Sequence, residues 1–352
     1  MRKGTALVVG ATGITGGNLA SYLTASGWSV YGLSRRPSDQ AGVIPVAADL
    51  LDREATAEAL AGLPITHVFY CTWVRRENEK ANVEANGAMM HNLLDALQGA
   101  SLAHVSLVTG TKQYLGAFEN YGSGKTETPF RESAPRVPGE NFYYTLEDTM
   151  FAKADRDGFS WNVHRPHTVI GYARGNAMNM GVTLAVYASI CKATGKPFTF
   201  PGSQVQWNAL TDLTDSLVLA RQMEWAATTP GAHNEAFNTV NGDVFRWRRL
   251  WHEIGEFFEL EVADCPETPQ PLETQMADIA PTWAEIVENN ELVEADVSKL
   301  ASWWHTDADL GRELECVNDV TKSRDFGFDH FRETRAALFD LFTRLRAERI
   351  IP

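Results

Sequence analysis

The glycine spacing of residues 10–16 limits the fold of this chain more than any other sequence feature. These residues follow the pattern Gly-x-x-Gly-x-x-Gly, after an apolar run at 6–9 and before residues with helical spacing at 19–23. Such glycines let the chain turn sharply and let backbone N–H groups approach a pyrophosphate at the start of a helix. A preceding strand and a following helix are the context that the motif requires. The sequence therefore predicts a dinucleotide site here, with a glycine turn that binds no ligand as the weaker alternative.

Further apolar runs repeat the strand pattern along the first half of the chain. They lie at residues 29–34, 67–71, 104–108 and 161–164, and a helical repeat of apolar residues at 89–97 separates two of them. Strands that alternate with helices indicate an α/β fold with a parallel, doubly wound sheet of the Rossmann type. Residues 116–139 contain several Gly and Pro residues without a period, which predicts a loop near the site.

The composition changes after about residue 171, where aromatic residues and methionines become frequent and the regular alternation is lost. A length of 352 residues suits two domains. We expect a dinucleotide-binding domain at 1–170 and a smaller, mostly helical substrate-binding domain at 171–352. A strand-like segment at 235–240 indicates that a stretch near 205–242 returns to the first domain.

Charge and cysteine usage exclude several classes of protein. The net charge of -14 argues against a nucleic acid or an anionic membrane as partner, because both would be repelled. The 4 cysteines are far apart and lack CxxC spacing, which predicts reduced thiols and no metal site. No apolar run approaches the roughly 18 residues that span a bilayer. A soluble, cytoplasmic protein is expected, and its oligomeric state stays open, with a homodimer as one option.

The end of the second predicted strand distinguishes between the two nicotinamide cofactors. Proteins that bind NAD usually have an acidic residue there for the ribose hydroxyls, whereas this chain has Ser34, Arg35 and Arg36. Two guanidinium groups suit a 2′-phosphate. The sequence therefore favours NADPH (NADP+) over NADH, and a solvated basic turn is the alternative.

Two short stretches, 109–114 and 141–148, indicate the chemistry. A short-chain reductase usually has Tyr and Lys four residues apart on one helix, so that the ammonium lies beside the phenol. The position four residues after Tyr144 is Asp148, so this pair is broken, and Lys112 at the end of an earlier strand can supply the missing cation. Tyr143 is adjacent and chemically identical. Because neighbours on a helix point about 100° apart, only one of the two can face a nicotinamide.

Five segments together carry a resemblance to a known family. They are Thr109-Gly-Thr-Lys-Gln-Tyr-Leu-Gly116, Asn141-Phe-Tyr-Tyr144 with Glu147-Asp148, Val68-Phe-Tyr-Cys-Thr-Trp73, His164-Arg-Pro166 and Asn234-Glu-Ala-Phe-Asn238. With them the chain resembles the progesterone 5β-reductase and iridoid synthase-like enzymes, which are enone reductases on the extended short-chain dehydrogenase scaffold. The similarity runs from Ala6 nearly to Pro352.

The resemblance implies NADPH-dependent 1,4-reduction of the C=C bond of an α,β-unsaturated carbonyl compound, with hydride added to the β-carbon. It implies Tyr144 and Lys112 as the catalytic residues. A phenol O–H is a suitable donor to the negative charge that develops on the carbonyl oxygen. A nearby ammonium would stabilise that charge and lower the pKa of the phenol. The expected partner is a small enone or enal, with steroids and terpenoids as candidates.

The motifs and the resemblance together predict which residues bind the cofactor and the substrate. The predicted cofactor-binding residues are Gly10, Thr12, Gly13, Ile14, Ser34, Arg35, Arg36, Asp49, Leu50, Thr72, Trp73, Val108, Thr109, Gly110, Tyr144, Pro166 and Val169. The predicted substrate-binding residues are Trp73, Phe118, Met178, Met180 and Phe339. Two alternatives remain. The first is a carbonyl reductase or sugar-nucleotide epimerase of the same scaffold, and Asp148 in place of the usual lysine argues against it. The second is a non-catalytic NADP(H)-binding regulator, which would need neither Lys112 nor Tyr144.

Overall fold

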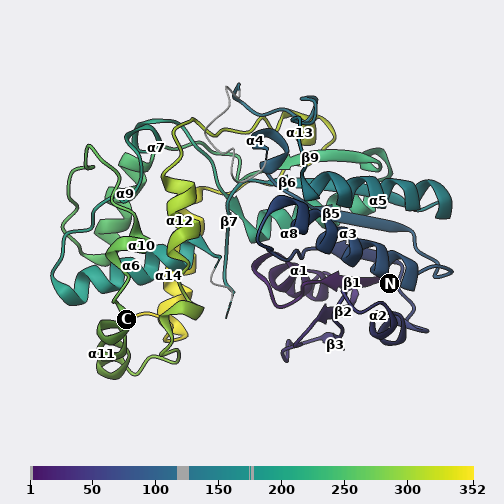
Figure 1. The fold of residues 1–352 in the computed structure, drawn as a ribbon, viewed down its shortest axis with the longest axis horizontal. Coiled ribbons are helices and arrows are strands. Elements are labelled where there is room, and N and C mark those ends of the chain that lie inside the picture. The colour runs from purple at the N-terminus through teal and green to yellow at the C-terminus, as the bar shows by residue number, and fades with distance from the viewer. Residues whose placement is uncertain (1–2, 117–126, 174, 176–177) are drawn as a thin grey trace.

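The computed structural model describes residues 3–116, 127–173, 175 and 178–352. Figure 1 shows two lobes, one built around a twisted sheet and one built mainly of helices. The N-terminus belongs to the sheet lobe and the C-terminus to the helical lobe. No helix in the described part of the chain is long and apolar enough to cross a membrane.

A seven-stranded parallel sheet forms the core of the first lobe and confirms the predicted Rossmann-type architecture. Its strands in spatial order are β3 (Val43–Ala47), β2 (Ser29–Ser34), β1 (Thr5–Val9), β4 (His67–Tyr70), β5 (His104–Val108), β6 (Ser160–Pro166) and β9 (Glu235–Thr239). The chain moves outward from β1 to β3 and then crosses back to β4, so the topological switch point lies between β1 and β4. Ligands of open α/β sheets bind beyond the carboxyl ends of the strands at this point.

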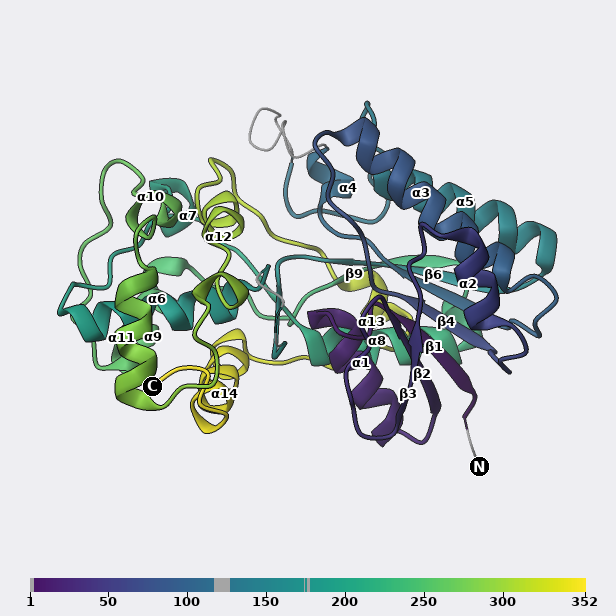
Figure 2. The same ribbon diagram turned by 60° about the horizontal axis from the view of Figure 1, so that its bottom comes forward.

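Helices cover both faces of the sheet, as Figure 2 shows. On one face lie α3 (Glu79–Ala96), α5 (Phe142–Asp157) and the shorter α2 (Arg53–Leu60), and on the other lie α1 (Ile14–Ala25) and α8 (Ser216–Thr228). Alternate residues of β1 enter the two apolar layers: Leu7 and Val9 pack with the α3 and α5 side, and Ala6 and Val8 with the α1 and α8 side. A strand buried on both faces is therefore apolar along its whole length, as its sequence is.

The second lobe is organised around α6 (Met180–Thr194). Its residues from Met180 to Cys191 are all buried, which is typical of a helix that is surrounded on every side. The apolar residues packed with it come mainly from α9 (Trp247–Phe258), α11 (Ala280–Asn290), α12 (Trp303–Leu310) and α14 (Thr334–Ala347). Smaller elements are α4 (Lys112–Leu115), α7 (Gln204–Asn208), α10 (Leu272–Gln275), α13 (Thr321–Asp325), the 3-10 turns Pro230–Ala232 and Val297–Lys299, and the paired strands β7 (Val169–Ile170) and β8 (Thr214–Asp215).

Candidate active site

A cavity of about 1250 Å³ runs along the carboxyl ends of the parallel strands. Its walls come from the residues that follow β1, β2, β3, β4, β5 and β6, and from α12 of the second lobe. The cavity therefore includes the topological switch point and lies where the two lobes meet. It is larger than the roughly 300–1,000 Å³ of a drug-sized ligand site, and so has room for a dinucleotide together with a small substrate.

The glycine turn between β1 and α1 forms one end of the cavity. Gly10 has φ +84°, and a Cβ atom there would lie 2.8 Å from the carbonyl oxygen of Cys71. A Cβ atom on Gly16 would lie 2.3 Å from the carbonyl oxygen of Gly10. Gly13 precedes α1, whose first turn has no side-chain cap. The turn therefore requires its glycines, and it presents uncapped helix N–H groups to an anion.

The residues after β2 form the part of the cavity expected to hold a ribose. Ser34, Arg35 and Arg36 all line it, and both arginines are exposed. The Ser34 hydroxyl is buried and has no hydrogen-bond partner in the described part of the chain. Buried hydroxyls normally have a partner, so this group fits a site that a polar ligand completes. Asp49 and Leu50, after β3, line the same region.

The side chain of Lys112 lies in the cavity wall directly after β5. Lys112 is the first residue of α4 and is only 2% exposed. The Nζ atom donates to Oε2 of Glu79 at 2.5 Å. It also lies 4.5 Å from the centre of the Phe142 ring. The predicted cation is thus held in place by a buried carboxylate and an aromatic ring, and both partners come from helices on one face of the sheet.

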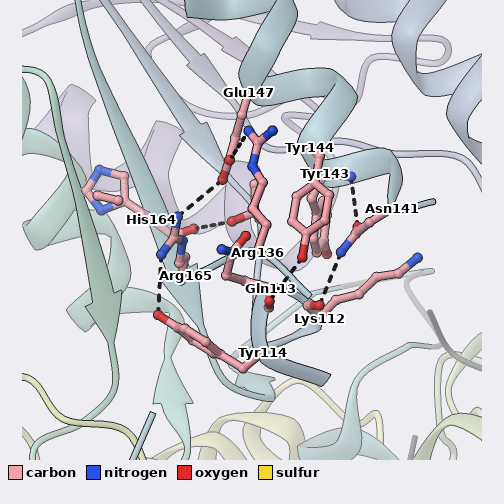
Figure 3. Close-up of polar contacts among 12 residues, drawn as sticks. Lys112, Gln113, Tyr114, Arg136, Asn141, Tyr143, Tyr144, Glu147, His164 and Arg165 are labelled. Atoms are coloured by element: carbon pink, nitrogen blue, oxygen red, sulfur yellow. Dashed lines mark hydrogen bonds and ion pairs between the residues drawn. The ribbon is translucent and has the colours of Figure 1, made fainter. Parts of the chain in front are cut away.

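The two adjacent tyrosines of α5 point in different directions, and the one on the cavity wall is not the predicted Tyr144. Tyr143 lines the cavity, whereas Tyr144 does not. The Tyr143 hydroxyl reaches the end of β5, where a Cβ atom on Gly110 would lie 3.6 Å from it. The Tyr144 hydroxyl accepts from the Val137 N–H at 2.9 Å and donates to the Gln113 carbonyl at 3.2 Å (Figure 3). Tyr144 therefore joins two backbone segments outside the cavity.

Burial makes the phenol of Tyr143 less acidic than a phenol in water. The pKa of Tyr143 is raised, first by burial and second by the negative charge of Glu79. A phenol in these surroundings keeps its proton at neutral pH and can donate it. Because Lys112 is paired with Glu79, it does not act on the phenol as an isolated cation would.

The residue four positions after Tyr143 is Glu147, so the usual Tyr and Lys pair is broken whichever tyrosine is considered. The Glu147 side chain is 3% exposed. Its carboxylate pairs with Arg136 at 2.7 Å and with Arg165 at 3.5 Å (Figure 3). Asp148 is exposed and pairs with the same Arg136 at 2.8 Å. Both acids thus anchor the segment around residue 136 to α5.

The predicted cofactor-binding residues other than Tyr144 all line the cavity. They are Gly10, Thr12, Gly13, Ile14, Ser34, Arg35, Arg36, Asp49, Leu50, Thr72, Trp73, Val108, Thr109, Gly110, Pro166 and Val169. This places the six sequence segments to which these residues belong around one cavity.

The predicted substrate residues separate into two groups. Trp73 and Met178 line the cavity. Met180 is 1% exposed in the core of the second lobe, and Phe339 packs on Phe257 with ring centres 4.8 Å apart, so neither reaches the cavity. Phe118 lies outside the described residues.

The sequence analysis missed a polar wall from the second lobe. Trp304, His305, Ala308 and Asp309 of α12, with Arg312 just after it, line the cavity. The Arg312 guanidinium donates to Nε2 of His167 at 2.7 Å, and Nδ1 of His167 lies 2.8 Å from Asp212. The acid and arginine three residues apart, at 309 and 312, are the one signal in the sequence that could have indicated this wall.

Comparisons with known proteins identify the family of the chain. Residues 40–352 match the family model of the PRISE-like Rossmann-fold domain. The chain is 38% identical over 364 residues to (S)-8-oxocitronellyl enol synthase of Nepeta cataria, covering 99% of this chain and 94% of the relative. It is also 38% identical over 364 residues to 3-oxo-Delta(4,5)-steroid 5-beta-reductase of Arabidopsis thaliana, with the same coverage of 99% and 94%.

Solved structures share the fold at much lower identity. The UDP-glucose 4-epimerase of Thermotoga maritima superposes with a TM-score of 0.70 at 13% identity, covering 97% of this chain and 99% of that one. The UDP-glucose 4-epimerase of Thermus thermophilus, in complex with NAD, gives a TM-score of 0.68 at 16% identity, with coverage of 97% and 99%. At these identities the likeness extends to the fold alone.

Proposed function

The chain belongs to the PRISE-like Rossmann-fold family, and on that premise we propose that it reduces the C=C bond of α,β-unsaturated carbonyl compounds with NADPH. The observation that carries the proposal is one cavity in which Lys112 and Tyr143 lie on the same wall as the glycine turn. The two curated relatives, named for an enol synthase and a steroid 5-beta-reductase, support an enone or enal as the substrate class.

NADPH is proposed as the cofactor because three features of the cavity suit it. The glycine turn and the uncapped start of α1 suit the pyrophosphate. Arg35 and Arg36 suit a 2′-phosphate, and the unpartnered Ser34 hydroxyl suits an added polar group beside it. When bound, NADPH supplies the hydride.

The residues of this chain have separate tasks in the proposed reaction. Hydride addition to the β-carbon drives the electron pair of the C=C bond toward the carbonyl oxygen, which becomes negative. Tyr143 donates its phenol proton to that oxygen, and a preorganised donor of this kind is worth several kcal/mol, about 10²–10³ in rate. The enol that forms tautomerises to the saturated carbonyl compound. Lys112 stabilises the negative charge that passes to the phenol oxygen, and Trp73 and Met178 enclose the substrate.

An epimerase or carbonyl reductase is the second candidate, since the solved neighbours include epimerases. That chemistry uses a Tyr and a Lys four residues apart on one helix. Here the corresponding position is Glu147, which is buried and paired with arginines. The local charge is therefore opposite to what that chemistry needs.

The proposal is tested by mixing purified protein and NADPH with 2-cyclohexen-1-one, a citral-type enal and progesterone. Absorbance at 340 nm reports cofactor oxidation, and product analysis identifies what forms. We expect the saturated ketone or aldehyde from at least one of them. Formation of an allylic alcohol would show carbonyl reduction instead. No oxidation with any of the three compounds, together with an epimerised product in a parallel incubation with a sugar nucleotide and NAD, would favour the epimerase.

A further inference from the structure

Glu79 makes three contacts that join separate elements of the active site. It is the first residue of α3 and is 8% exposed. Its Oε2 accepts from Nζ of Lys112 at 2.5 Å and from Nδ2 of Asn82 at 3.3 Å. Its Oε1 accepts from the backbone N–H of Phe142 at 2.8 Å, at the first residue of α5. One carboxylate therefore touches the predicted cation and the start of the helix that carries Tyr143.

This carboxylate is not needed to cap its own helix. The cap of α3 is Asn78, whose side chain accepts from the Ala81 N–H at 2.9 Å. Glu79 instead satisfies an N–H at the start of α5, where the helix dipole favours a negative charge. The start of α5 also has its own cap, since Asn141 accepts from the Tyr143 N–H at 3.1 Å. The position of Glu79 is thus set by the site and not by the needs of α3.

Burial makes the pair of Glu79 and Lys112 interdependent. A buried ammonium without a counter-ion tends to lose its proton, and a buried carboxylate without one tends to gain it. Held together, each partner stabilises the charged form of the other. Glu147, which lies one helical turn after Tyr143 on α5, is already paired with Arg136 and Arg165.

We propose that Glu79 is a positioning residue of the reaction, which holds the Lys112 ammonium against the start of α5 and keeps Tyr143 protonated as the donor. The inference rests on the proposed enone reduction. To that reaction it adds Glu79, a residue that lies outside the cavity wall and acts through Lys112 and the start of α5.

The direction in which Glu79→Gln moves the pKa of Tyr143 follows from the charges of Glu79 and Lys112. In Glu79→Gln the amide oxygen can still accept from the Phe142 N–H, but the negative charge is gone. If Lys112 stays protonated, its ammonium stabilises the phenolate of Tyr143; if it loses its proton, the charge that raised the phenol's pKa is still absent. In both cases Tyr143 releases its proton at lower pH than in the natural protein. The high-pH limb of kcat/KM moves to lower pH in both cases.

Three variants test the proposal by steady-state kinetics from about pH 6 up to the highest pH at which each protein stays folded, because the raised pKa of Tyr143 puts its high-pH limb above about pH 10. We expect Glu79→Gln to reduce kcat at neutral pH by about 10- to 100-fold, the scale of a misplaced catalytic group. We expect its high-pH limb to move down by about one pH unit or more. Glu79→Asp keeps the charge and should return the limb to its natural position. Glu84→Gln, on the exposed face of the same helix, is the matched control and should change neither quantity.

A second readout does not depend on turnover. Titration of tyrosine absorbance near 295 nm, compared between Glu79→Gln and Glu79→Gln/Tyr143→Phe, isolates the ionisation of Tyr143. We expect this step at lower pH than the same difference between the natural protein and Tyr143→Phe. A loss of activity in Glu79→Gln with an unmoved limb and an unmoved tyrosine step would show a structural role alone and overturn the proposal. If the natural protein reduces no enone, the proposed function fails, while the titration still decides the role of Glu79.

Discussion

At the scale of single residues, the choice between Tyr143 and Tyr144 shows where sequence reasoning stops. Both follow Asn141 and Phe142, and the family motif contains both. What separates them is a contact with Val137 and Gln113, which lie outside α5. The helix points the two side chains about 100° apart, and this contact holds Tyr144 outside the cavity while Tyr143 lies on its wall. The two side chains differ in surroundings, not in chemistry, so no local pattern could assign them.

This pair provides a matched test. Tyr143→Phe should reduce kcat by about 10²–10³, because it removes one preorganised donor to the carbonyl oxygen. Tyr144→Phe should leave kcat within about threefold and lower the free energy of unfolding by about 0.5–1.5 kcal/mol, because it removes a hydroxyl bonded to two backbone groups. Enone kinetics and urea unfolding of both variants measure this. The reverse order of the two kcat values would return the catalytic role to Tyr144.

The arginines after β2 carry the second residue-scale prediction. Replacing Arg35 and Arg36 together by Ala should weaken NADPH binding by about tenfold or more and leave NADH binding nearly unchanged, since only NADPH has the 2′-phosphate. Fluorescence titration with each cofactor gives both dissociation constants. Equal weakening for the two cofactors would indicate that the arginines do not contact the 2′-phosphate.

At the scale of elements, the strands, the glycine turn and the apolar stripe of α3 could be predicted because their signals are local. The strands are apolar runs, and the turn needs glycines that lie within seven residues of one another, at 10, 13 and 16. The polar N-terminal part of the same buried face could not be predicted in the same way. Its side chains Glu79, Asn82 and Asn86 bond to residues of other elements, and those partners are known only from the fold.

The buried polar residues of α3 lead to a prediction about the loop after β4. Asn86 is fully buried, accepts from the Val74 N–H at 2.8 Å and donates to the Val74 carbonyl at 2.8 Å. Asn86→Ala would leave both backbone groups without these partners, at a cost of about 1–3 kcal/mol of unfolding free energy. Because Thr72 and Trp73 precede Val74 and line the cavity, we also expect a higher KM for enone and NADPH.

Unfolding curves and initial rates measure the two effects of Asn86→Ala. Glu84→Ala on the exposed face of α3 is the control and should leave both unchanged. A loss of stability with unaltered KM values would show that Asn86 stabilises the fold without positioning the cavity wall.

At the scale of the whole molecule, the contribution of the second lobe was the least predictable part. Aromatic residues and methionines are common both in cores and in pockets, so identity alone does not separate them. Met180 and Phe339 became part of the second lobe's core or packed against it, and α12 supplied the cavity wall instead. That assignment depends on how residues 303–312 pack against the end of β6, far away in the sequence.

Buried histidines give the whole molecule a pH dependence of stability. His164 in β6 is fully buried, with Nδ1 2.9 Å from Oε1 of Gln222, and burial lowers its pKa to about 4 against the opposing effect of that hydrogen bond. Burial also lowers the pKa of His67 to about 4 and that of His104 well below its ordinary value. The unfolded chain, with histidine pKa values of about 6.5, binds these protons more readily than the folded chain does. The free energy of unfolding is therefore highest, as far as these histidines determine it, above pH 6.5, and it decreases as the pH falls from 6.5 toward 4.

For His164 alone a difference of this size corresponds to about 3 kcal/mol when the transition is complete. His167 acts in the opposite sense, because against the effect of burial its hydrogen bond to Asp212 raises its pKa to about 9, but that contribution changes only between about pH 9 and pH 6.5. Urea unfolding at about pH 6.5, 5.75 and 5 should therefore show a free energy of unfolding that falls with pH in the natural protein. In His164→Asn, which cannot gain a proton in this range, the fall should be smaller, even if this variant is less stable at every pH. The carboxylates with lowered pKa values, such as Asp95 and Asp309, titrate below this window and do not produce the slope. Equal slopes for the two proteins would mean that His164 does not contribute to the loss of stability in acid.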